Sequence, residues 1–152
     1  MADERFGSDR KMGFKLATAF AGSSARVWLV DDQMDFRKTR AGLLESAHGF
    51  TCDRQFGSAE ELIEALQTTS GPDVILLEQA LPGMSGTAAV KIIKASSPPT
   101  LVFLVTVFKS YRHASEALKN GASGYFGKDD PLEMLALAMR AALDGRELPA
   151  AR

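Results

Sequence analysis

Five short apolar runs alternate with five helical segments between residues 26 and 143, and this alternation constrains the fold more than any other feature of the sequence. Most of the runs have strand length, and residues 74–77 form a continuous apolar stretch of the kind found in strands covered on both faces. The predicted strands are Val27–Val30, Phe50–Phe56, Val74–Leu77, Thr100–Thr106 and Ser123–Gly127.

Start and stop signals mark the segments between the strands as helices. Ser58 and Glu61 form a capping box, and Gly49 and Gly121 are stop signals. Asp130 followed by proline has the order of a cap and a first turn. The predicted helices are Met34–Ala47, Ala59–Gln67, Thr87–Ala95, Lys109–Asn120 and Pro131–Leu143, the last one ending before Gly145. In the first helix, Phe36, Leu43 and Leu44 are the side chains available for the core.

Strands that alternate with helices at this spacing predict an α/β fold with one doubly wound parallel sheet. Parallel neighbours need crossover connections, and right-handed crossovers place helices on both faces of the sheet. The chain has 152 residues, which is the size of one such domain. In these folds the carboxyl ends of the strands form the ligand crevice. The residues at those ends are therefore the candidates for function.

Charge and cysteine content exclude several classes of function. The net charge is −1, so no overall charge attracts the chain to nucleic acid or to acidic membranes. Cys52 is the only cysteine, which excludes an intrachain disulfide and a zinc site made of several cysteines. It is most simply a small apolar residue of the second strand.

No stretch of the sequence has the length and apolarity of a membrane span. The longest apolar run, residues 101–108, has the length of a strand. Residues 16–22 have a weak likeness to a signal peptide, but Asp3, Glu4 and Asp9 contradict the basic start that such a peptide requires. We therefore expect a cytoplasmic protein with no membrane contact.

Five polar residues follow the predicted strands at the edge where a ligand would bind. They are Asp31 and Asp32 after the first strand, Glu78 after the third, and Thr106 and Lys128 at the ends of the fourth and fifth. Clustered carboxylates repel each other unless a cation joins them, and hard oxygen ligands suit Mg²⁺. A lysine and a hydroxyl can hold the oxygens of a phosphoryl group.

These residues resemble those of the receiver domain of bacterial two-component response regulators. The likeness covers residues 25–146 and rests on LVDD at 29–32, PDVILLEQALPGMSG at 72–86, FLVTV at 103–107 and GASGYFGK at 121–128. It implies the flavodoxin-like (CheY-like) strand order 2-1-3-4-5. Residues 1–24 are then an N-terminal extension outside the domain, and residues 147–152 are a tail or the start of a linker.

The resemblance also implies roles for individual residues. Those implied to hold Mg²⁺ are Asp31, Asp32, the backbone carbonyl of Ala80 and, as a further ligand, Glu78. Those implied to contact the phosphoryl group or to report its presence are Thr106, Lys128 and Tyr125.

The chain departs from the family pattern at the phosphoacceptor, where the family has aspartate and this sequence has Glu78. The extra methylene moves the carboxylate by roughly 1.5 Å, and a misplacement of order 1 Å can cost about 100-fold in rate. We therefore predict a poor or absent phosphoacceptor that partly imitates the phosphorylated form, with one negative charge instead of about −1.5 to −2. Val107 either narrows the entrance for a phosphodonor or simply extends the buried strand.

Three functions remain open, and none of them makes the chain an enzyme. The first is a pseudo-receiver or phosphomimetic module that acts through protein contacts without phosphorylation. The second is a conventional Mg²⁺-dependent receiver altered at its acceptor. The third, from another class, is an FMN-binding flavodoxin-like redox protein, although Asp31, Asp32 and Gln33 stand where flavodoxins need a loop that accepts phosphate.

The last predicted helix indicates where a partner would bind. Residues 132–143 are mostly apolar, and Glu133, Arg140 and Asp144 occupy one narrow stripe. We expect a homodimer or another protein domain to contact this helix. The junction at residues 128–131 resembles the receivers of LuxR-type regulators, which predicts a sensor histidine kinase as partner. Such a regulator would act on transcription, with DNA contact only through a domain absent from the sequence.

The two histidines give no site by themselves. His48 lies at the end of the first helix, where a favourable contact with the helix dipole explains it. His113 lies in the fourth helix, with no second metal ligand near it in sequence.

Overall fold

The computed structural model describes residues 24–147, and these fold around one sheet of five parallel strands. The strand order is β2-β1-β3-β4-β5, so the predicted doubly wound, flavodoxin-like fold is confirmed. The strands are β1 (Arg26–Val30), β2 (Thr51–Phe56), β3 (Val74–Leu77), β4 (Leu101–Thr106) and β5 (Gly124–Gly127). Pairing is regular except for a register shift between β1 and β2 near Arg26.

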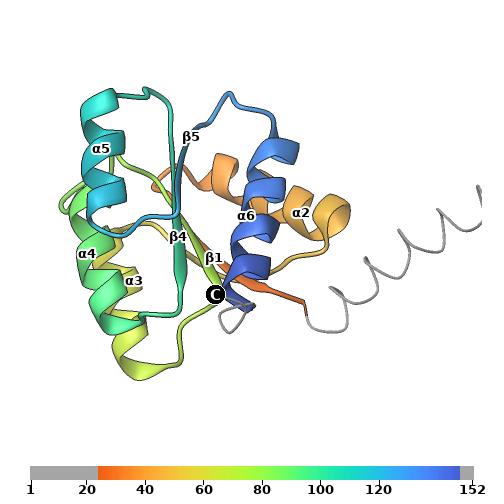
Figure 1. Ribbon diagram of the computed structural model, residues 1–152, viewed down its shortest axis with the longest axis horizontal. Helices are drawn as coiled ribbons and strands as arrows, with labels where there is room; N and C mark the ends of the chain where they lie inside the picture. Colours follow the sequence, from red (N-terminus) through yellow and green to blue (C-terminus); the bar gives the residue numbers. More distant parts are fainter. Residues whose placement is uncertain (1–23, 148–152) are drawn as a thin grey trace, which may run out of the picture.

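Helices cover both faces of the sheet, as the crossover argument requires (Figure 1). Helices α2 and α6 lie on one face, and α3, α4 and α5 lie on the other. The helices are α2 (Met34–His48), α3 (Ala59–Thr68), α4 (Gly86–Ser96), α5 (Tyr111–Lys119) and α6 (Leu132–Glu147).

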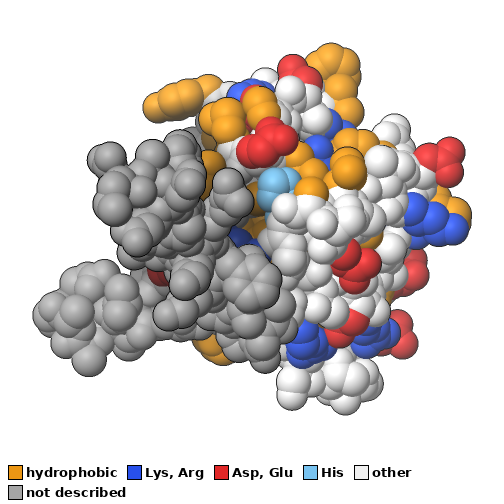
Figure 2. Space-filling view, turned by 90° about the vertical axis from the view of Figure 1, so that its right-hand side faces the viewer, with side chains coloured by type: hydrophobic (Ala, Val, Ile, Leu, Met, Phe, Trp, Pro, Cys, Tyr) orange, Lys and Arg blue, Asp and Glu red, His pale blue; other side chains and the backbone are white. Residues whose placement is uncertain are grey.

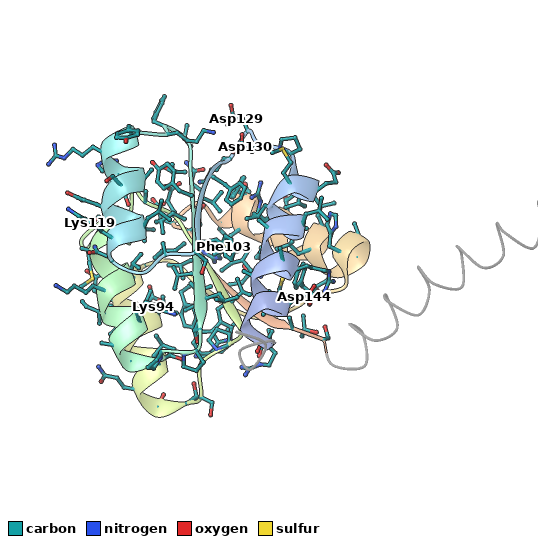
Figure 3. The ribbon with its side chains drawn as sticks, viewed as in Figure 1. Lys94, Phe103, Lys119, Asp129, Asp130 and Asp144 are labelled. Carbon is teal, nitrogen blue, oxygen red and sulfur yellow. The ribbon has the colours of Figure 1, made fainter. Side chains whose placement is uncertain are left out.

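Two apolar cores form because successive side chains of each strand point to opposite faces. Trp28, Ile75 and Leu104 belong to the core under α3, α4 and α5. Phe103, in the middle of the sheet in Figure 3, belongs with Leu44 to the core under α2 and α6. Each large apolar side chain buried in this way stabilises the fold by about 1.5–3 kcal/mol. The two cores fix the sheet that carries the candidate site.

Side-chain caps and one left-handed glycine set several helix ends. The Oγ of Ser58 accepts a hydrogen bond from the backbone N–H of Glu61 at 3.2 Å, which confirms this cap. Ser85 and Ser110 cap α4 and α5 in the same way. Gly49 ends α2 with φ 73°, the left-handed conformation that favours glycine.

Several predicted helix ends differ from the structure by one residue, and three predictions are wrong by more than that or in the cap. Helix α5 begins at Tyr111 instead of Lys109, because Ser110 takes the cap position. Helix α6 continues through Gly145 to Glu147. Asp130 does not cap α6: its carboxylate accepts a hydrogen bond from the N–H of Gly127 at 2.8 Å, and this bond lowers the pKa of its carboxyl.

Two smaller predictions concern α2 and β2. Leu44 is fully buried, as expected, but Leu43 is 47% exposed, so its assignment to the core is wrong. His48 does lie in the last turn of α2. Partial burial, with the nearby carboxylates of Glu45 and Asp53, raises the pKa of the Cys52 thiol to about 12.

Parts of the predicted domain organisation lie outside the described residues. The predicted N-terminal extension, apart from Ser24, and residues 148–152 of the predicted tail belong to this group. Within residues 24–147, no helix has both the length and the apolar character needed to cross a bilayer.

Candidate functional site

The carboxyl edge of the sheet carries the polar residues that the sequence analysis singled out. Strands β1, β3 and β4 pair in register through Val30, Leu77 and Leu104, so the residues that follow them meet at one edge. Strand β5 pairs with β4 up to Gly127, which directly precedes Lys128. The loop after β5 lies at the top of the molecule, where Asp129 and Asp130 are labelled in Figure 3.

Lys128 joins the carboxylates of two different strands at this edge. Its Nζ lies 2.7 Å from Oδ2 of Asp31 and 2.9 Å from Oε1 of Glu78. The side chains of Lys128, Asp31 and Glu78 are 9%, 7% and 4% exposed, so the three charges form a nearly buried cluster. The Nζ also lies 4.3 Å from the centre of the Phe36 ring, a cation–π contact.

The surroundings favour the charged form of Lys128. Burial by itself acts to lower the pKa of the ammonium group, but the hydrogen bonds and negative charges of Asp31 and Glu78 outweigh burial. The pKa of Lys128 is therefore raised above its ordinary value. The ammonium remains protonated at neutral pH and holds the two carboxylates together.

The second oxygen of each carboxylate accepts a hydrogen bond from the backbone. Oε2 of Glu78 accepts the N–H of Ala80 at 2.8 Å, and Oδ1 of Asp31 accepts the N–H of Gln33 at 2.9 Å. All four carboxylate oxygens of this pair therefore already have a donor. Asp32, in contrast, is exposed to solvent.

This arrangement does not fit a tightly held divalent cation. In the part of the chain that the structure describes, no group of three or more His, Cys, Asp and Glu side chains is placed to bind a metal. The ammonium of Lys128 lies between the carboxylates of Asp31 and Glu78, where a shared metal would compete with it. Asp32 and Ala80 line a pocket that Glu78 also borders.

The pocket at this edge has a volume of about 440 Å³. Its polar lining includes Asp32, Glu78 and Thr106, and Val107 and His113 also border it. Val107 follows the last residue of β4 and is 51% exposed, which favours its interpretation as part of the entrance over a buried strand position. His113 has a place at this pocket that the sequence analysis did not predict.

Thr106, at the end of β4, lines the pocket, and Tyr125 lies on the neighbouring strand β5. Thr106 is 3% exposed at the end of β4. The hydroxyl of Tyr125, in β5, accepts a hydrogen bond from the N–H of Ser110 at 3.1 Å. Because Ser110 caps α5, Tyr125 connects the strand that leads to Lys128 with the start of that helix.

A buried amide connects the Glu78 position with α4. Gln79 is 7% exposed, and its Oε1 accepts hydrogen bonds from the N–H and the hydroxyl of Thr87, the first of them at 2.8 Å. The carbonyl of Thr87 accepts a bond from Asn120 at 3.0 Å, which extends the chain of contacts to the end of α5. Sequence analysis missed Gln79. A polar residue between a buried strand and a proline–glycine loop is a signal for a side chain that bonds to the first turn of the next helix.

Helix α2 contributes two arginines that sequence analysis did not assign to the site. Arg37 donates hydrogen bonds to the carbonyl of Asp31 at 2.6 Å and to that of Phe56 at 3.3 Å. Arg40 is only 9% exposed, and its guanidinium carbon lies 4.7 Å from the centre of the Phe36 ring. The two arginines lie three residues apart on the helix, a spacing that places them on one face.

Fold and site together define a class: a doubly wound domain with two buried carboxylates, a hydroxyl and a lysine at the carboxyl edge of its sheet. Residues 27–140 match the response regulator receiver domain family. The chain belongs to this family, which supports the receiver interpretation over the flavin-binding alternative.

Curated relatives of the chain include transcriptional regulators. It is 33% identical over 123 residues to the uncharacterized transcriptional regulatory protein YxjL of Bacillus subtilis, covering 81% of this chain and 56% of that protein. It is 37% identical over 115 residues to the DNA-binding transcriptional regulator NtrC of Klebsiella pneumoniae, covering 75% of this chain and 24% of the relative. The chain thus spans just over half of the first protein and about a quarter of the second.

Solved structures show the same fold. A LuxR-family two-component response regulator from Aurantimonas sp. SI85-9A1 has a TM-score of 0.74 and 29% identity, over 81% of this chain and 87% of that chain. The signal receiver domain of the putative response regulator NarL from Mycobacterium tuberculosis has a TM-score of 0.70 and 25% identity, over 82% and 98%. Receiver domains of this family are generally non-enzymatic signalling modules, and they typically bind Mg²⁺ at the acceptor site.

Proposed function

We propose that this chain is a receiver module whose output does not depend on phosphorylation of its acceptor position. The observation that carries the proposal is the state of Glu78: one carboxylate oxygen contacts Lys128 at 2.9 Å and the other accepts the N–H of Ala80 at 2.8 Å. A nucleophile must present a free oxygen in line with phosphorus. Both oxygens of Glu78 are instead held by donors.

The same contacts support the phosphomimetic part of the proposal. The carboxylate of Glu78 contacts Lys128, which is the lysine that contacts the phosphoryl group in the family. Its single negative charge substitutes for part of the charge that phosphorylation adds. We assign Glu78 as the acceptor-equivalent residue, and Thr106, Lys128 and Tyr125 as the residues that set the state of the domain.

We propose a weak Mg²⁺ site at the same edge, formed by Asp32 and the carbonyl of Ala80 with Asp31 and Glu78 beside them. Asp32 is exposed and borders the pocket with Ala80 and Glu78. Weak binding follows because Lys128 already satisfies Asp31 and Glu78. When bound, Mg²⁺ would supply charge neutralisation for an incoming phosphodonor.

Incubation with acetyl phosphate and excess Mg²⁺, followed by intact mass spectrometry, tests the proposal. We expect no phosphoryl adduct on the unaltered protein. Glu78→Asp shortens the side chain and withdraws its carboxylate from Lys128, so we expect this variant to gain one phosphoryl group. The matched control is Glu78→Asn, which has the length of aspartate without a nucleophilic oxygen and is expected to stay unmodified.

The outcome is decisive in either direction. A phosphoryl adduct located at Glu78 of the unaltered protein contradicts the proposal and supports a conventional receiver altered at its acceptor. An adduct that forms only on Glu78→Asp supports the proposal. It shows that the unaltered site lacks only a correctly placed carboxylate for phosphoryl transfer.

We also propose that α6 forms a protein contact. Leu137 is 70% exposed and Met134 is 54% exposed on this helix, whereas its neighbours Leu135 and Met139 are buried against the sheet. Figure 2 views the molecule from the side of α2 and α6, and hydrophobic side chains gather in the upper part of that face. The contact would be with a second copy of the chain or with another domain.

Leu137→Glu is expected to weaken self-association by at least tenfold, because it places a charge in an apolar contact. Size-exclusion chromatography with light scattering over a range of concentrations measures this change. Leu118→Glu on α5, where Leu118 is 53% exposed, is the matched control and should have no effect. A strict monomer at high concentration that Leu137→Glu leaves unaltered contradicts the homodimer.

The wider role follows from the family and stays a proposal for this chain. We infer a receiver unit at residues 25–146, an N-terminal extension and a C-terminal tail or linker. The unit would work in the cytoplasm, with a sensor histidine kinase as upstream partner and transcription as output. DNA contact would come through a domain outside this sequence, as the likeness to transcriptional regulators suggests.

A further inference from the structure

Arg40 is a buried cation close to the carboxylates of Asp31 and Glu78. It lies in α2, is 9% exposed, and lines a small void together with Asp31, Phe36 and Glu78. The void has a volume of about 10 Å³, close to the minimum that holds one water molecule. A guanidinium group keeps its charge in proteins, so this position carries a permanent positive charge.

The contacts of Arg40 lead to the site. Arg40 and Asp31 line the same void. Burial lowers the pKa of the Arg40 guanidinium group, and the negative charge of Asp31 opposes that effect. Both Arg40 and Lys128 contact the Phe36 ring, at 4.7 Å and 4.3 Å from its centre. A buried charge is costly unless an opposite charge compensates it. Asp31 and Glu78 are the buried carboxylates that line the same void.

The two carboxylates that line the void have cations next to them without any added ion. Asp31 and Glu78 line it together with Arg37 and Arg40, and Lys128 contacts both carboxylates from outside the void. Arg37 is used differently, because its guanidinium donates to the backbone carbonyls of Asp31 and Phe56.

We propose that Arg40 and Lys128 together balance the charge of Asp31 and Glu78 from within the protein, so that these two carboxylates need no divalent cation and the site binds one weakly. This inference deepens the proposed function, because it assigns the weak Mg²⁺ affinity to a residue outside the pocket. Arg40 acts here as a positioning residue: it changes the electrostatic potential that a metal meets and does not touch the metal.

Titration of the purified protein with Mn²⁺ alone, followed by electron paramagnetic resonance, tests the role of Arg40, and calorimetry with Mg²⁺ alone repeats the test. Arg40→Met keeps the apolar stem and removes the charge, so we expect the affinity for both ions to rise about tenfold or more. Arg40→Gln should do the same, and it serves as a second variant if the first folds poorly. Arg40→Lys retains the charge and should leave the affinity low.

Lys119→Met is the control for net charge. Lys119 is exposed on α5, on the opposite side of the molecule from α2 in Figure 3, so its removal should not change the affinity. Equal affinity in the unaltered protein, Arg40→Met and Arg40→Gln overturns the proposal. So does a rise of the same size in Lys119→Met.

One measurement needs no variant. Millimolar Mg²⁺ should leave the midpoint of thermal unfolding of the unaltered protein unchanged, because a ligand that binds weakly adds little stability. A shift of several degrees overturns the proposal. These assays contain no phosphodonor, so their result is independent of whether Glu78 accepts a phosphoryl group.

Discussion

Lys128→Met is expected to lower the free energy of unfolding by about 3 kcal/mol at neutral pH. The substitution leaves the carboxylates of Asp31 and Glu78, which are both almost fully buried, without the ammonium that lies 2.7 and 2.9 Å from them. Removing one partner of a buried ionic cluster is costly because the remaining charges stay desolvated and repel each other. Urea denaturation followed by the fluorescence of Trp28 measures the loss.

The pH dependence of this loss follows from the pKa of Lys128. Its pKa in the folded protein is raised above the unfolded value of about 10.4, so folding favours the protonated form. The contribution is therefore complete below about pH 10.4 and disappears as the pH rises through the folded pKa. The difference in stability between the unaltered protein and Lys128→Met should be constant from pH 7 to about 9 and should shrink at higher pH.

Two variants separate the buried cluster from an ordinary surface ion pair. Lys109 pairs with Asp130 at 3.4 Å, and its side chain is 52% exposed, so Lys109→Met should cost less than about 1 kcal/mol. Adding Glu78→Gln to Lys128→Met removes one of the repelling charges and should restore part of the lost stability. Equal stability of Lys128→Met and the unaltered protein would contradict a buried ionic cluster.

Sequence alone predicted the edge of the sheet at which these residues meet, because that prediction needs only the order and period of the elements. An apolar run such as Val74–Leu77 indicates a doubly covered strand, and the residue after it must lie at the carboxyl edge. Parallel pairing then brings Asp31, Glu78 and Lys128 together although Asp31 and Lys128 are 97 positions apart. The contacts among their side chains are a consequence of this topology.

The residues of α2 that pack against this part of the sheet were not predictable in the same way. A pattern of apolar positions places Leu43 in the core, but α2 turns Arg40, Ala41 and Leu44 inward and leaves Leu43 half exposed. Sequence analysis assigns a charged residue to the surface by default. Arg40 is buried because the folded chain brings residues of β1 and β3 next to it.

Local competition between hydrogen bonds explains the missed helix ends. Ser110 captures the N–H of His113 and delays the start of α5, whereas Asp130 bonds to Gly127 and leaves the start of α6 to the residues after it. Each of these side chains had two plausible backbone partners in sequence. Which backbone group each side chain bonds to depends on where β4 and β5 end.

Gly86→Ala is expected to destabilise the domain by about 2–4 kcal/mol and to disturb the site. A Cβ atom at Gly86 would collide with the carbonyl oxygen of Glu78 and would lie only 2.8 Å from Cδ1 of Leu104 and 2.9 Å from Cα of Gln79. Two of these three atoms belong to the backbone after β3, so no side-chain rotation relieves the contact. Either α4 moves away from the sheet or the backbone of Glu78 shifts.

Helix α4 contacts the residue that follows Glu78, so Gly86→Ala is expected to change the site as well as the stability. Moving α4 outward pulls Thr87 from Gln79, and so weakens the cap that holds the residue directly after Glu78. Gly42→Ala is the matched control, because Gly42 lies within α2 and its Cβ would meet no atom within 4 Å. That change should stabilise the protein by about 0.5–1 kcal/mol, since alanine favours the helix. Thermal unfolding of both variants measures the change in the midpoint of unfolding. A lower midpoint for Gly86→Ala and a higher one for Gly42→Ala show that the close approach of the backbone requires glycine at position 86. A change in the same direction for both variants contradicts this account.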